Sequence, residues 1–221
     1  MKNSKTINWA AGAVIVAMAA WLYLVLFPTP PAIDARPHQG LGEVMAGEAV
    51  KLAEGGARII IITRDMGSFR LPAAEVQLAG CLAALKSAGK TPAATRTIKA
   101  DPLRVVGVPP GEFFEILRQG KENDVIVSFL GPPMLDAAQI AKLGPKRSRI
   151  VALCAGTMPA RVDLKRAFEQ QLLHVAIVSR PDAPAQAAAG NTRSAFEQMF
   201  KVITPGNVAE LSTLTAAATA D

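Results

Sequence analysis

Four consecutive isoleucines at residues 59–62 constrain the fold of this 221-residue chain more than any other feature. A β-branched run this short is typical of a strand buried on both faces, in a parallel sheet covered by helices. Thr63, Arg64, Asp65, Met66 and Gly67 follow it directly. A polar, glycine-containing turn at the carboxyl end of a strand is where open α/β sheets bind ligands. The run therefore predicts both a fold class and the edge of the sheet at which a site is expected.

Helical and strand patterns alternate along the chain around this run. Buried strands are expected at 124–130, 149–154 and 174–179, and one further strand at either 95–98 or 104–108. Helices are expected at 41–53, 72–88, 109–117, 135–143, 163–173 and 191–203. The alternation predicts a three-layer α/β domain with a five-stranded, mostly parallel sheet, in the flavodoxin-like strand order 2-1-3-4-5.

The N-terminal region differs in composition from the rest. Residues 9–27 form an uncharged run that is long enough for a transmembrane helix. Lys2 and Lys5 before this run favour a cytoplasmic N-terminus. A cleavable signal peptide is the competing interpretation. The predicted organisation is a cytoplasmic tip and membrane anchor at 1–27, a proline-rich stalk at 28–38, an α/β domain at 39–204 and a flexible tail at 205–221.

The loops after strands one, three, four and five share one edge of such a sheet. They offer hydroxyls, two cations and a carboxylate, a set that suits a small polar or anionic ligand. The candidate ligand-binding residues are Thr63, Arg64, Asp65, Ser68, Gly131, Thr157, Ser179 and Arg180. The competing interpretation is that every sheet of this kind has polar turns at this edge.

An enzymatic alternative rests on Cys154 and Arg161. Cysteine-dependent phosphatases cradle phosphate in a strand-to-helix loop, with five residues between the nucleophile and an arginine, whereas six separate the two here. Cys154 could instead be a core residue, or could pair with Cys81 in a disulfide if the domain lies outside the cytoplasm. No phosphate-binding loop, nucleophile elbow or metal-ligand spacing occurs, so no cofactor or metal is predicted.

Four segments together resemble one lobe of a type I periplasmic binding protein: RIIIITRD, GEFFEILRQGKENDVIVSFLGPP, RIVALCAG and HVAIVSRPD. The resemblance spans residues 58–204. It implies that loops at the strand ends hold a small ligand, at Thr63, Asp65, Ser68, Gly131, Thr157 and Arg180. Members of that family close two lobes around the ligand, and this chain has residues for one. The resemblance therefore implies a second wall from another subunit, or a docking role.

The leading hypothesis is a single-pass inner-membrane protein with a periplasmic or extracellular domain that binds a small polar solute or an envelope partner without catalysis. The partners implied are the membrane, through residues 9–27, the small solute, and a second copy or an envelope protein. The net charge of +6, of which Lys2 and Lys5 supply two, is too mild for nucleic-acid binding. The alternatives are the Cys154 enzyme and a structural scaffold. The sequence leaves ligand identity and oligomeric state open.

Overall fold

The computed structural model describes residues 3–26, 33–67, 70–99 and 107–212. The chain divides into two compact units, Met1–Ile33 and Asp34–Asp221. Residues 3–26 of the first unit form the helix α1 (Asn3–Leu26). Among the residues described, no helix combines the length and the apolar character needed to cross a membrane. The transmembrane span expected at residues 9–27 is therefore not supported by the structure.

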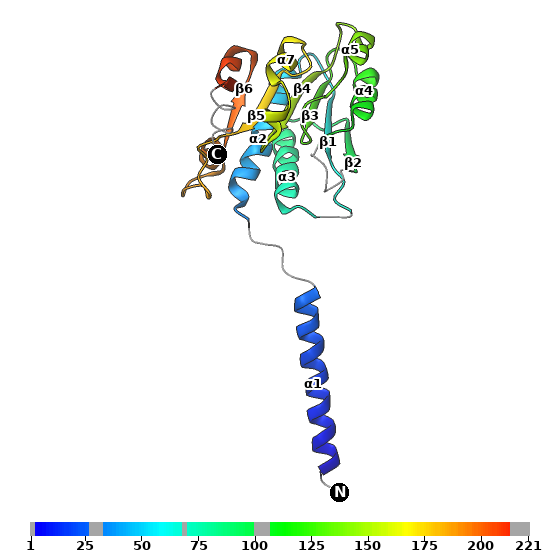
Figure 1. Ribbon diagram of the computed structural model, residues 1–221, viewed down its shortest axis with the longest axis vertical. Helices are drawn as coiled ribbons and strands as arrows, with labels where there is room; N and C mark the ends of the chain where they lie inside the picture. Colours follow the sequence, from blue (N-terminus) through cyan, green and yellow to red (C-terminus); the bar gives the residue numbers. More distant parts are fainter. Residues whose placement is uncertain (1–2, 27–32, 68–69, 100–106, 213–221) are drawn as a thin grey trace. The chain divides into compact units, whose positions relative to one another are not determined.

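The second unit is an α/β domain (Figure 1). Its elements are α2 (Ala35–Leu52), β1 (Ile59–Arg64), α3 (Pro72–Ser87), β2 (Ala94–Ile98), α4 (Pro110–Gln119), β3 (Val125–Ser128), α5 (Ala137–Leu143), β4 (Arg149–Cys154), α6 (Met158–Arg161), α7 (Leu164–Glu169), β5 (Val175–Ser179), α8 (Thr192–Met199), β6 (Phe200–Ile203) and the 3₁₀ helix η1 (Pro205–Glu210). The sheet has the order β2-β1-β3-β4-β5-β6. The first five strands are parallel in the predicted order, and β6 is antiparallel to β5.

The sixth strand corrects the prediction of a five-stranded sheet. Residues 200–203 were expected to continue the last helix, but they pair with β5, from Phe200 opposite Ser179 to Ile203 opposite Ala176. A helix ending at residue 203 would leave the outer edge of β5 without hydrogen-bond partners, which the antiparallel strand supplies. Phe200 and Ile203 are both buried in the strand. Their apolar character is compatible with either a helix or a strand, so pairing with β5 determines which of the two forms.

The second strand lies at 94–98, which confirms the first of its two predicted positions. The alternative at 104–108 lies mostly outside the described residues. The predicted stalk at 28–38 is partly helical, because α2 begins at Ala35 with Asp34 as its N-cap. The described part of the predicted tail is folded as well, since η1 is followed by the buried Leu211.

Helices cover both faces of the sheet, as the three-layer prediction requires. Alternate residues of β1, β3, β4 and β5 enter two separate cores. Ile61 packs with α2, α3 and α8 on one face, and Ile62 packs with α4, α7 and Leu211 on the other. Figure 1 shows the strands between these two helical layers. This double burial explains why β1, β3, β4 and β5 appear in the sequence as continuous apolar runs.

Helix α2 approaches both of its neighbours through glycines. A Cβ added at Gly42 would lie 2.1 Å from the carbonyl oxygen of Gln77 in α3, and one at Gly80 of α3 would lie 2.7 Å from the carbonyl oxygen of Gln39. On the other side of α2, a Cβ at Gly40 would lie 2.4 Å from the carbonyl oxygen of Thr192 in α8. Backbone therefore meets backbone at these crossings, and no side chain fits between the helices.

An ion pair holds the amino ends of the central strands. The buried carboxylate of Asp124, just before β3, accepts hydrogen bonds from Arg58 Nε at 3.0 Å and from the backbone N–H of Lys121 at 2.8 Å. Burial alone would raise the pKa of Asp124, but these bonds and the charge of Arg58 overcome it and lower the pKa. This pair lies at the edge of the sheet opposite to the candidate site.

Candidate functional site

The loops named in the prediction follow the carboxyl ends of β1, β3, β4 and β5, which are consecutive neighbours in the sheet. The strand order reverses between β1 and β3, so the switch point lies where the sequence placed it. The structure directly joins two of the loops, because the backbone N–H of Gly156 donates to Ser179 Oγ at 3.2 Å. We call the eight candidate residues and their loops the rim.

The β1 part of the rim presents two charged side chains. Arg64 and Asp65 are both partly exposed, whereas Thr63 is buried within the strand. Asp65 Oδ1 accepts a hydrogen bond from the backbone N–H of Gly67 at 2.9 Å, which fixes the turn, and the backbone N–H of Asp65 donates to the carbonyl of Ile98. In the part of the chain that the structure describes, Arg64 has no ion pair. Ser68 lies outside the described residues.

Gly131, after β3, is not open to a ligand. It is buried with φ +91°, and a Cβ at this position would lie 2.5 Å from the sulfur of Met158. The hydroxyl of Ser128 donates to the carbonyl of Gly131 at 2.6 Å, which holds the turn closed. Met158 thus covers the β3 loop, and the sequence carried no signal for this contact because the two residues belong to different strand-to-helix connections.

The β4 and β5 part of the rim is largely satisfied internally. Arg180 donates to both carboxylate oxygens of Asp182, at 3.1 Å each. These hydrogen bonds raise the pKa of Arg180 and lower that of Asp182. Thr157 is exposed at the start of α6 and makes no capping hydrogen bond there. Asp182 was not among the predicted site residues, although its position two residues after Arg180 was a usable signal.

The rim is too wide for one small ligand to contact all of it. Neighbouring strands lie about 4.8 Å apart, so the ends of β1 and β5, three spacings apart, are separated by roughly 14 Å. Asp65 and Arg180 therefore belong to different subsites, of which the β1 subsite is formed by Arg64 and Asp65. Of the two, the β1 subsite has the polar groups with fewer internal partners.

Cys154 and Arg161 do not form a phosphatase-like pair. The Cys154 thiol is fully buried in the core beneath α7, and burial raises its pKa far above the usual range. Arg161 is exposed at the end of α6. Cys81 lies in the core on the opposite face of the sheet, where burial raises its pKa to about 12, and both cysteines are free thiols. A thiolate nucleophile requires a lowered pKa and access to substrate, and neither cysteine has them.

The histidines serve structural contacts. His38 of α2 lies 3.2 Å from the side-chain amide of Gln77, and His174 Nδ1 accepts a hydrogen bond from the backbone N–H of Ile150. Within residues 3–26, 33–67, 70–99 and 107–212, no three His, Cys, Asp or Glu side chains are grouped so that they could hold a metal ion.

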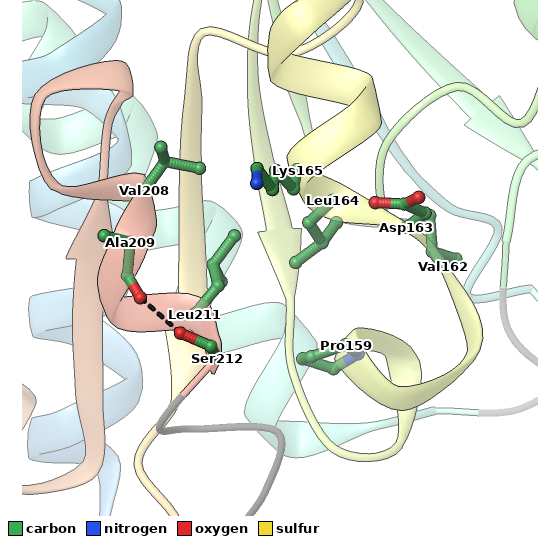
Figure 2. Close-up of a pocket in the computed structure, with 9 residues that line it drawn as sticks. All are labelled: Pro159, Val162, Asp163, Leu164, Lys165, Val208, Ala209, Leu211 and Ser212. Atoms are coloured by element: carbon green, nitrogen blue, oxygen red, sulfur yellow. Dashed lines mark hydrogen bonds between the residues drawn. The ribbon is translucent and has the colours of Figure 1, made fainter.

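A cavity of about 410 Å³ lies beside the β4 end of the rim. Figure 2 shows that its walls come from two segments, the α6–α7 connection and η1 with the residues after it. Leu164 and Leu211 contribute apolar side chains, and the Ser212 hydroxyl donates to the carbonyl of Ala209 at 2.6 Å. The cavity is mainly apolar, so it suits packing of a hydrophobic group better than recognition of a polar solute.

The sheet order and the two helical layers form an α/β lobe whose fold is similar to that of periplasmic solute-binding proteins. A carbohydrate-transporter solute-binding protein from Agrobacterium radiobacter, solved with D-arabinose, has the same fold, with TM-score 0.50 and 11% identity over 82% of this chain and 63% of that one. Also similar are a solute-binding protein from Burkholderia graminis in complex with D-arabinose (TM-score 0.49, 15% identity, 77% and 61% covered) and an arabinose-binding protein from Geobacillus stearothermophilus (TM-score 0.49, 10% identity, 80% and 63% covered).

The chain therefore spans less than two thirds of the length of these solved proteins. No family model matches the sequence, and no curated protein matches it. The resemblance expected from the sequence is confirmed for the fold.

Proposed function

We propose that this domain is a non-catalytic binding module for a small polar solute, and that the solute binds at the β1 subsite of the rim. The observation that carries the proposal is the turn at the strand-order switch point, which exposes a guanidinium and a carboxylate side by side in sequence. In open α/β sheets this position is where ligands bind.

Arg64 and Asp65 supply the chemistry that a polyol needs. A guanidinium donates several hydrogen bonds in a fixed plane and a carboxylate accepts them, so the turn offers both a donor and an acceptor to the hydroxyl groups of a solute. Asp65 Oδ1 is used by the turn, which leaves Oδ2 for a ligand. D-arabinose is a suitable first probe, because the Agrobacterium radiobacter protein of this fold was solved with it.

The subsite is one wall of a binding cleft. The chain matches 63% of the length of the arabinose-bound protein, so we propose that a second copy or an envelope protein supplies the opposite wall. We also propose that the domain works outside the cytoplasm, in line with the N-terminal charge bias and with the solute-binding proteins of this fold. Membrane attachment through residues 9–27 stays a prediction, and the binding proposal does not depend on it.

The test is thermal unfolding of the full chain in the presence of D-arabinose and other sugars. A ligand at about 100 times its Kd stabilises the folded state by about 2.7 kcal/mol, which raises the Tm of a domain of this size by roughly 5–10 °C. We expect this shift to vanish in Asp65→Asn. The variant keeps an oxygen at Oδ1 to accept from Gly67, so the turn is preserved while the charge is lost.

The matched control is Asp182→Asn, at the other end of the rim. It removes a carboxylate that is bound to Arg180 and should leave the sugar-induced shift unchanged. A shift of equal size in wild type and Asp65→Asn would show that the solute does not bind at the β1 subsite. No shift with any sugar would count against solute binding by this lobe.

A further inference from the structure

A second cavity lies apart from the β1 subsite, on the face of the sheet that carries α5 and α7. Its volume is about 540 Å³, within the range of about 300–1,000 Å³ typical of small-molecule sites. One wall is the stretch from Pro133 to Ile140 around the start of α5, and the other runs from Arg161 at the end of α6 to Leu172 after α7. We call it the α5–α7 groove.

Two arginines, Arg161 and Arg166, line the α5–α7 groove. Arg161 and Arg166 are exposed, and within the described part of the chain neither guanidinium makes an ion pair or a side-chain hydrogen bond. Elsewhere in the domain, arginines are usually paired with carboxylates. Those with such a partner are Arg36, Arg58, Arg70, Arg118, Arg149, Arg180 and Arg193.

The groove contains two carboxylates, but both are engaged by backbone. Asp136 caps α5 by accepting from the N–H of Gln139 at 2.8 Å, and Asp163 caps α7 by accepting from the N–H of Arg166 at 2.9 Å. An aspartate at an N-cap is also stabilised by the positive end of the helix. The capping role holds these carboxylates at the helix ends, so the donors of Arg161 and Arg166 stay available.

The remainder of the lining is largely apolar. Met134 and Leu135 come from the α5 side, and Val162, Ala167 and Leu172 come from the α7 side. Met134 is among the exposed large hydrophobic residues of the domain. A ligand matched to this groove has an apolar body against these side chains and an anionic group that takes a bidentate hydrogen bond from a guanidinium.

We propose that the α5–α7 groove binds a small organic anion, a molecule with a carboxylate or phosphate group attached to an apolar body, through Arg161 and Arg166. This site is independent of the proposed solute site, because it lies on a helical face and shares no residue with the β1 subsite. Both can be occupied at once.

The test is isothermal titration calorimetry of the full chain with phenyl phosphate and benzoate, and with benzyl alcohol as the neutral analogue. We expect the two anions to bind and benzyl alcohol to bind far more weakly, since it keeps the apolar body and lacks the charge. Inorganic phosphate should also bind more weakly than phenyl phosphate, because it lacks the apolar body. In Arg161→Gln/Arg166→Gln the Kd for phenyl phosphate should rise by roughly tenfold or more.

Two controls separate the groove from general charge effects. Arg193→Gln removes an exposed arginine of α8 on the opposite helical layer and should leave the Kd unchanged. Met134→Gln keeps both guanidiniums and places a polar group on the apolar wall. It should therefore weaken the binding of phenyl phosphate but not the binding of inorganic phosphate. Equal Kd values in wild type and the double arginine variant, or no heat with either anion, would overturn the proposal. Neither result bears on sugar binding at Asp65.

Discussion

Replacing Gly42 by alanine should lower the free energy of unfolding by about 3 kcal/mol, although alanine is the better helix former. The added methyl would lie 2.1 Å from the carbonyl oxygen of Gln77 and 2.6 Å from the backbone nitrogen of Cys81. Both atoms are backbone of α3, so no side-chain rotation can relieve the overlap. Helix α2 must move away from α3, which loosens the core that both helices share with β1. Urea unfolding followed by circular dichroism measures the loss.

Gly47→Ala is the matched control in the same helix. Gly47 is exposed, and a Cβ there would have no atom within 4 Å. The same substitution should therefore raise the free energy of unfolding by about 1 kcal/mol, through helix propensity alone. If the two variants have equal stability, the close approach of α2 to α3 is not present in solution.

Asp124→Ala should lower the free energy of unfolding by about 2 kcal/mol, the second largest effect that we expect. The side chain of Asp124 is 3% exposed and holds Arg58 and the N–H of Lys121, which lose their acceptor in the variant. The figure is at the lower end for a charged hydrogen-bonded pair, because the side chain of Arg58 is 46% exposed and water can replace part of the interaction. Equilibrium urea unfolding at neutral pH gives the value.

The acid dependence of stability provides an independent readout of the same pair. The pKa of Asp124 is lower in the folded chain than its ordinary value of 3.8, so the carboxylate stabilises the fold above that pH. This contribution is lost as the pH falls through the folded-state pKa, and the difference between wild type and Asp124→Ala should shrink there. Asp182→Ala, which removes an exposed carboxylate from Arg180, should leave the free energy of unfolding nearly unchanged. A constant difference from pH 7 to pH 3 contradicts the assignment.

Sequence patterns predicted the central sheet well because its strands are buried on both faces. The isoleucines at 59–62 and the run at 149–154 have no polar alternation, and short apolar runs of this kind have few other structures available to them. The same reasoning failed at residues 200–203. There the sequence FKVI continues a helical pattern, and only the unpaired edge of β5 shows why it forms a strand.

The site was predicted less completely than the fold. Strand alternation placed Arg64, Asp65 and Arg180 on the same edge, and the structure agrees with that topology. Gly131 was misjudged because its accessibility depends on Met158, which comes from the next connection of the sheet. The α5–α7 groove carried no recognisable motif, since Arg161 and Arg166 come together with Met134 only when α5 and α7 pack on the same face.

The position of α2 between α3 and α8 has a consequence for the newly made chain. Helix α2 is the first element of the domain to leave the ribosome, yet its Gly40 packs against Thr192 of α8. The Thr192 hydroxyl also donates a hydrogen bond to the carboxylate of Glu43, 149 residues earlier in the chain. At about 5–20 residues per second, translation needs roughly 7–30 s to deliver that partner. During this interval the side of α2 that faces α8 stays uncovered, so the core shared by α2, α8 and the sheet can close only after α8 has emerged.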